Sequence, residues 1–194
     1  MESPASFEVE LSWIKNEKIR NFTQHCLENA PAYFYTNASS STGKYHSTWS
    51  NGDGGLIRHT KATAFVAKEL APAYGLSADE TDAVVSAAIL HDLCKYGIPG
   101  GKHTTSDHDY KGALMVHFLA KPFAEKGEPI PMIAEICAGI AWHFGKWSKR
   151  KEGVRIKKFP EEYSKIETLV HIADMVASRK GITFDFLEES SLCG

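Results

Sequence analysis

The apolar residues of this chain recur at intervals of three and four along most of its length, which is the spacing of one face of an α-helix. Residues 11–29 show the pattern, because Leu11, Ile14, Ile19 and Phe22 follow one another at roughly helical intervals. We find no internal repeat and no run of any length in which apolar and polar residues alternate, as they do in a half-buried strand. The sequence therefore predicts an all-α fold, a bundle of about six or more helices.

Local signals mark the ends of the expected helices. Ser77 and Glu80 form a capping box at the start of the third helix, and Gly97 is a natural stop for it. Proline is favoured in the first turn of a helix and disfavoured further in, so prolines start or end several others. Six helices are expected: 11–29, about 56–71 (from Leu56 to before Pro72), 77–97, 107–121 (before Pro122), 131–144 (from Pro131) and 161–179. Residues 31–55 are expected to form a loop.

The composition is that of an ordinary globular protein. The 194 residues are 43% hydrophobic and 24% charged, with a formal net charge of −2, so we expect one domain without a general affinity for nucleic acid or membranes. A cytoplasmic location is expected, because we see no signal peptide and no apolar run near the roughly 20 residues of a membrane span. Free thiols are expected for the four cysteines, which form no CxxC pair: Cys26, Cys94, Cys137 and Cys193.

Six residues at or near the expected helix ends are candidate metal ligands: His59, His91, Asp92, His108, His143 and Asp174. His91 and Asp92 follow the apolar run SAAIL, and Asp174 lies inside the apolar segment LVHIADMVASR. Burying such groups costs free energy unless they are hydrogen-bonded, ion-paired or bound to a metal. The alternatives to metal binding are a hydrogen-bonded pair of His91 and Asp92 in the core, and a salt bridge from Asp174 to Arg179 or Lys180. Two such residues in one small domain favour a shared site, and imidazole with carboxylate ligands suits Mn, Fe, Co, Ni or Zn.

In their order along the chain, His59, the pair His91-Asp92 and Asp174 resemble the H…HD…D signature of HD-domain metal-dependent phosphohydrolases. Two longer motifs strengthen this resemblance. HSTWSNGDGGLIRHT (46–60) is similar to a segment in the HD domain of Gram-positive 3′–5′ exoribonucleases, where a GGL turn starts the helix that bears the first metal histidine. HDLCK resembles the family's HDxGK, with Cys94 in place of the usual glycine. The resemblance implies these boundaries: a single HD domain over residues 1–194, a core over about 45–180, and the helix 11–29 packed on that core.

The resemblance also implies a metal centre of one or two divalent ions, with Mg²⁺ as an alternative to the transition metals. The ligands it implies for the first ion are His59, His91, Asp92 and Asp174. Asp92 would bridge to a second ion held by His108 and His143, which lie in the motifs HDYKGA and WHFGK. His117 is a rival to His108, and Phe144 stands where two-metal relatives have a second histidine. With a single ion, His108 and His143 would instead bind phosphate or donate a proton.

The implied chemistry is hydrolysis of a phosphate ester by a metal-activated water. We expect Asp92, Lys95 and His143 to be catalytic, with Lys95 steadying phosphate oxygens unless it is merely a solvated lysine. The segment SSSTGKYH lacks the spacing of a nucleotide-binding P-loop. Its Lys44 and His46 are instead expected to line the mouth of the site.

The segment KWSKRKEGVRIKK (146–158) holds seven basic residues and one acidic residue. It is either a solvated loop or a substrate-binding element in which Lys146, Trp147 and Arg150 attract phosphate and stack a base. The expected substrate is a nucleotide or another phosphorylated small molecule, with a single-stranded nucleic-acid end as an alternative. A small substrate is favoured, because the chain has no strand signal for an added oligonucleotide-binding barrel. A catalytically inactive HD module that binds a nucleotide or a protein partner is the alternative function, and a homo-oligomer is left open.

Overall fold

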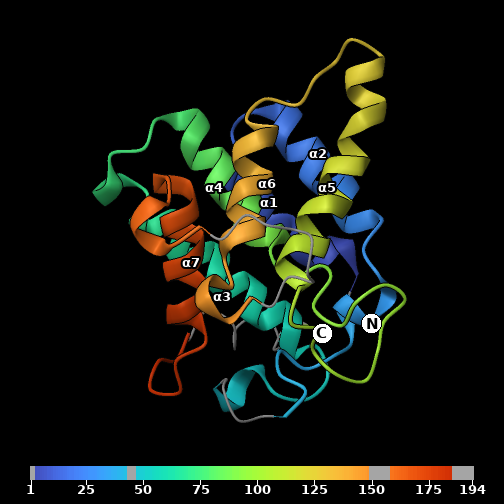
Figure 1. Cartoon of the computed structure of the whole chain (residues 1–194), viewed down its shortest axis with the longest axis vertical. Helices are drawn as coiled ribbons and strands as arrows, with labels where there is room; N and C mark the ends of the chain where they lie inside the picture. The colour runs from blue at the N-terminus through green and yellow to red at the C-terminus, as the bar shows by residue number, and fades with distance from the viewer. Residues whose placement is uncertain (1–2, 43–46, 149–157, 185–194) are drawn as a thin grey trace.

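The computed structural model of the chain describes residues 3–42, 47–148 and 158–184. Within these residues all regular structure is helical, so the prediction of an all-α fold with six or more helices is confirmed (Figure 1). The described ranges contain seven α-helices: α1 (Glu8–Trp13), α2 (Glu17–Glu28), α3 (Gly55–Leu70), α4 (Ala78–Leu90), α5 (His108–Glu125), α6 (Ile133–Trp142) and α7 (Lys165–Ala177). None of the helices described is long and apolar enough to cross a membrane.

Helix α4 forms the centre of the bundle. Every residue from Asp82 to Leu90 is buried, and α4 packs against α2, α3, α6 and α7 (Figure 1). A helix that is apolar on all sides is buried on all sides. Because α4 is central, the residues that follow its last turn are delivered to the interior of the bundle.

The predicted helix over 11–29 is wrong as a single element, since the chain turns between α1 and α2. The side chain of Asn16 accepts hydrogen bonds from two backbone N–H groups and caps α2. The buried carboxylate of Asp82 on α4 accepts two more, from the backbone N–H of Lys15 at 3.0 Å and of Asn16 at 2.6 Å. A buried acceptor far along the chain therefore replaces the continuous helix, which a local pattern cannot indicate.

Several other predicted helix ends are also corrected. Helix α4 begins at the predicted capping box but ends at Leu90, well before Gly97. Pro122 lies inside α5, which continues to Glu125. The loop expected over 31–55 contains two short 3₁₀ turns, and the segment beginning at Glu161 is likewise a 3₁₀ turn before α7. Helix α6 begins two residues after Pro131, and helix α7 begins at a second capping box, formed by Ser164 and Glu167.

Candidate metal centre

The turn before α3 fixes the position of His59. Gly54 caps the helix in the left-handed conformation, with φ of 67°. A Cβ atom on Gly55 would lie 2.0 Å from the carbonyl oxygen of Ser50, so this position admits only glycine. The GGL turn therefore starts α3 as expected, and His59 lies on its first turns with no exposed surface.

Arg58 holds the same turn in place, a role that the sequence did not suggest. Its guanidinium donates hydrogen bonds to the backbone carbonyls of Trp49 at 2.6 Å, Asn51 at 2.9 Å and Asp53 at 3.0 Å. The planar fork of arginine suits several acceptors in one loop. The loop that leads into the His59 helix is therefore tied to that helix.

The other five candidate ligands come from four further helices of the bundle or from the residues next to them. His91 and Asp92 follow the last residue of α4, His108 is the first residue of α5, His143 follows the last residue of α6, and Asp174 lies on α7. The side chain of Asp174 is 16% exposed, and the remaining ligands are fully buried or nearly so. Three helix ends and two helix interiors thus bring all six candidates into one cluster.

One oxygen of Asp92 faces the first group of ligands. Its Oδ2 lies 3.3 Å from Nε2 of His91 and 3.6 Å from Nε2 of His59. Oδ1 of Asp174 lies 3.0 Å from Nε2 of His59, and the two histidine nitrogens are 3.4 Å apart. One ligand atom from each of His59, His91 and Asp174 can be chosen so that all three lie within 4.8 Å of one another. This group has the size of a metal site.

The other oxygen of Asp92 faces the second group. Its Oδ1 lies 3.3 Å from Nε2 of His108 and 3.5 Å from Nε2 of His143. These two histidine nitrogens are 3.2 Å apart. The carboxylate of Asp92 therefore lies between two pairs of imidazoles, with one oxygen towards each pair.

Three of the histidines are oriented in the same way. Nδ1 of His91, His108 and His143 each lies 2.6 to 2.7 Å from the backbone carbonyl oxygen three residues earlier. A carbonyl oxygen only accepts, so Nδ1 carries the proton and, in the neutral ring, Nε2 presents a lone pair. These lone pairs point at one another and at the oxygens of Asp92. A cation among them removes that repulsion, and backbone-anchored imidazoles of this kind are typical of metal ligands.

Burial and neighbouring charges shift the pKa values of the clustered residues in opposite directions. Burial lowers the pKa of His59. Burial also disfavours the ionised form of Asp92, but Lys95 and His91 hold the pKa of that carboxyl well below its ordinary value. The pKa of Asp174 is likewise lowered against burial by its hydrogen bond with His59, and the pKa of His91 is raised against burial by Asp92. Both carboxylates therefore stay ionised and are available as ligands for a cation.

Lys95 belongs to the cluster as well. Its side chain is 8% exposed, and Nζ lies 2.5 Å from Oδ2 of Asp92. Burial disfavours its charged form, but Asp92 and Asp174 raise its pKa, so it remains a cation. The alternative of a solvated lysine is therefore wrong. The alternative of a salt bridge from Asp174 to Arg179 or Lys180 finds no support among the described ion pairs, in which Asp174 meets only histidines.

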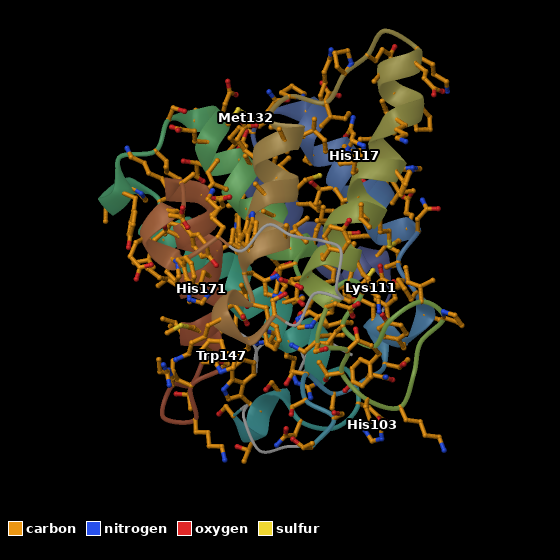
Figure 2. The ribbon with its side chains drawn as sticks, viewed as in Figure 1. His103, Lys111, His117, Met132, Trp147 and His171 are labelled. Atoms are coloured by element: carbon orange, nitrogen blue, oxygen red, sulfur yellow. The ribbon has the colours of Figure 1, made fainter. Side chains whose placement is uncertain are left out.

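His171 supports the cluster from behind and was missed by sequence reasoning. Its Nδ1 donates to the backbone carbonyl of His143 at 2.6 Å, and its ring fills the space beside Gly145, which has φ of 58°. Figure 2 shows His171 on α7. It lies three residues before Asp174, so both residues share one helix face. That spacing was the signal available in the sequence.

A series of rings leads from the cluster to the surface. The ring of Phe144 lies 4.5 Å from that of His108 and 6.4 Å from that of Trp147, measured between centroids. Trp147 is 50% exposed, and Nζ of Lys146 lies 5.0 Å from the centre of its ring. An exposed aromatic surface with a cation beside it therefore lies close to the buried ligands.

The remaining candidates are placed as follows. His117 is exposed and lines a groove between α5 and α6, so His108 and not His117 faces Asp92. Figure 2 shows His117 and Trp147 towards opposite ends of the molecule. Three candidate substrate-binding residues lie outside the described residues: Lys44, His46 and Arg150. Of the cysteines, Cys26, Cys94 and Cys137 are free, and Cys193 lies outside the described residues.

Comparison with known proteins gives one result that bears on this geometry. The model of the HD domain family matches residues 56–178, which include all six candidate ligands. No curated protein and no solved structure matches the chain.

Proposed function

The chain belongs to the HD domain family, whose members are generally metal-dependent phosphohydrolases, and from this premise we propose that it hydrolyses phosphate esters of nucleotides. The proposed ligands of a first ion are His59, His91, Asp92 and Asp174. The proposed ligands of a second ion are His108 and His143, with Asp92 shared. Transition metals such as Mn, Fe, Co, Ni or Zn fit this mixture of imidazole nitrogens and carboxylate oxygens.

The observation that carries the proposal is the position of Asp92. Its two oxygens face two pairs of histidine nitrogens at 3.3 to 3.6 Å. In the neutral rings of His91, His108 and His143, Nε2 presents a lone pair, because Nδ1 donates its N–H to the backbone. A core hydrogen-bonded pair would need one donor for each acceptor, whereas this cluster has an excess of acceptors. Metal binding explains that excess.

A bound divalent metal supplies a water whose pKa is lowered towards about 7 and a positive charge beside the phosphate. The residues of the chain supply the positive charge that holds the phosphate and the group that protonates the leaving oxygen. Lys95 brings a second positive charge into the buried cluster, where it is suited to a phosphate oxygen. Asp92 keeps that lysine charged and holds it in place. With a single ion, His143, steadied through its carbonyl by His171, would instead be the residue suited to donate a proton to the leaving oxygen.

The substrate class is inferred from the rings beside the cluster. Trp147 presents half of its surface to solvent, near the cationic Lys146 and separated from His108 by one ring. A nucleobase stacks on such an indole, while the basic side chain attracts phosphate. We therefore favour a nucleotide over a simple phosphorylated metabolite. The resemblance of residues 46–60 to an exoribonuclease segment supports a phosphodiester, and stacking at Trp147 accounts for one base, so we favour a small substrate over a long strand.

Replacing Trp147 by alanine tests this substrate class. We expect KM for a nucleotide to rise by about tenfold, since stacking of one base contributes roughly 1–3 kcal/mol, while turnover of p-nitrophenyl phosphate stays unchanged. Phe159→Ala, at a residue that is also more than half exposed, is the control. An equal loss on both substrates would contradict nucleotide stacking. Metal binding by the wild-type chain without turnover of any ester would instead identify a catalytically inactive binding module.

A further inference from the structure

Helices α5 and α6 leave an apolar groove on the surface. The groove has a volume of about 310 Å³, and its floor is made largely of small side chains. Those side chains are Ala134, Cys137, Ala138 and Ala141 on α6, with Tyr110, Ala113, Leu114 and His117 on α5. We refer to this groove, together with the exposed residues beside it on α5, as the α5–α6 face.

A ridge of large apolar side chains borders the groove. Leu114 is 36% exposed and Phe118 is 57% exposed, and they lie four residues apart on one face of α5. A single exposed apolar residue needs no explanation, but an apolar ridge beside an apolar groove is typical of an interaction site. Neither the groove nor the ridge takes part in the candidate metal centre. The only ligands that α5 and α6 contribute to it are His108, the first residue of α5, and His143, the residue after α6.

We propose that the α5–α6 face binds a second copy of this chain, through a two-fold axis that runs parallel to the two helices. In a two-fold interface the same surface of both copies is in contact. A ridge beside a groove is therefore self-complementary, because the ridge of each copy can fill the groove of the other. Such an axis places α5 of one copy opposite α6 of the other. The ridge of each copy then enters the alanine-lined groove of its partner.

The register of the two helices supports this arrangement. Gly112 on α5 lies against Ile140 on α6, where an added Cβ would meet the isoleucine at 3.3 Å. The chain connects α5 to α6 by a short loop, so the two helices run in opposite directions (Figure 1). With a rise of about 1.5 Å per residue, Leu114 lies about 3 Å along the helix axis from this contact. Ala138, two residues before Ile140 on the antiparallel α6, lies at the same height. Phe118 stands about 9 Å above it, level with Ala134. Each ridge residue therefore meets an alanine of the partner copy.

The charges at the upper end of the face are complementary. Lys121 on α5 is exposed, with Nζ 4.5 Å from the ring centre of Phe118. Glu135 on α6 is also exposed. No ion pair is formed by either residue within the part of the chain that the structure describes. Lys121 and Glu135 differ by ~6 Å in position along the helix axes, which is about the length of a lysine side chain. The two-fold arrangement therefore brings Lys121 of each copy within reach of Glu135 of the other. The exposed cation and anion thus select a second copy as the partner.

Sedimentation equilibrium of the full chain tests the proposal. Because association follows mass action, we expect a monomer–dimer equilibrium between about 1 and 200 µM protein. Phe118→Glu should weaken the dimer at least tenfold, since it places a charge in an apolar groove. The matched control is Val9→Glu on α1, at a residue that is 61% exposed and distant from the face in sequence. Circular dichroism verifies that each variant is folded.

A charge exchange tests the geometry itself. Lys121→Glu and Glu135→Lys should each weaken the dimer, and the two changes together should restore it. A wild-type chain that stays monomeric over the whole range, or a dimer that Phe118→Glu leaves unchanged, overturns the proposal. A dimer that Phe118→Glu breaks but the charge exchange does not restore overturns the two-fold arrangement. None of these results depends on metal binding or hydrolysis.

Discussion

At the scale of single residues, Asp92 and Lys95 form the buried ion pair around which the candidate metal ligands are arranged. Both side chains are almost entirely inaccessible, and the lysine nitrogen contacts the same carboxylate oxygen that faces His59 and His91. Removing one partner of a buried pair leaves the other charge without compensation. A substitution at Asp92 therefore affects stability and metal binding through separate causes, and an experiment can separate them.

Asp92→Asn should abolish metal binding and hydrolysis. It should also destabilise the fold by roughly 3–5 kcal/mol, because the charge of Lys95 is left buried and unpaired. The double variant with Lys95→Met removes that charge, so we expect it to recover most of the stability but none of the bound metal. Denaturant unfolding and metal analysis of both variants measure the two effects. Retention of metal and of a near-normal rate in Asp92→Asn would show that Asp92 is not a ligand.

At the scale of secondary-structure elements, the two groups of ligands have different origins. The first group comes from α3, the end of α4 and α7, whereas the second comes from the start of α5 and the end of α6. Because α5 and α6 contribute only to the second group, the two halves can be tested independently.

Replacing His108 or His143 by alanine should lower the metal content by about one equivalent and leave the ion bound by His59, His91, Asp92 and Asp174 in place. His117→Ala is the matched control, since this histidine is on α5 but is exposed and faces the groove. Mass spectrometry of the metals in each purified variant gives the count. Loss of activity with an unchanged metal content would support a single ion, with these histidines acting on the phosphate or the leaving group.

The turn between α1 and α2 yields a prediction about stability. Asp82→Ala removes the acceptor for the backbone N–H groups of Lys15 and Asn16. Donors left without a partner cost about 1–3 kcal/mol in the free energy of unfolding. Glu69→Ala, at an exposed residue on α3, should change that free energy by less than about 0.5 kcal/mol. Equal stability of the two variants in urea titrations would contradict the role of Asp82.

At the scale of the whole molecule, the sequence predicted the helical class and named six candidate ligands that the structure brings into one cluster, but it did not predict the contacts between distant segments. Ser77 and Glu80 could be read as a helix start because capping is local. The break after α1 could not be predicted, because the acceptor that causes it, Asp82, lies 66 residues further along the chain from Asn16. His171 was missed for a similar reason, since its partner is a backbone carbonyl that belongs to another helix end.

The basic segment after His143 bears on the size of the substrate, although most of it lies outside the described residues. Neutralising Lys149, Arg150, Lys151 and Arg155 should leave metal content unchanged and raise KM for a mononucleotide only modestly. A strand engages several phosphates at once, so its binding would instead weaken with a salt slope reduced by about 0.7 per lost contact. A large, length-dependent loss on oligonucleotides would reverse our preference for a small substrate.

The central claim is that the cluster binds a divalent metal and that hydrolysis requires it. The most direct test is to measure metal content and hydrolysis of a panel of mononucleotides and phosphodiesters on the same wild-type preparation. The measurements are repeated after chelation and again after Mn²⁺ is added back. We predict about one to two equivalents of bound transition metal, loss of hydrolysis with the metal, and its return on addition. A chain that binds no divalent metal, or whose hydrolysis survives complete removal of metal, would contradict this account.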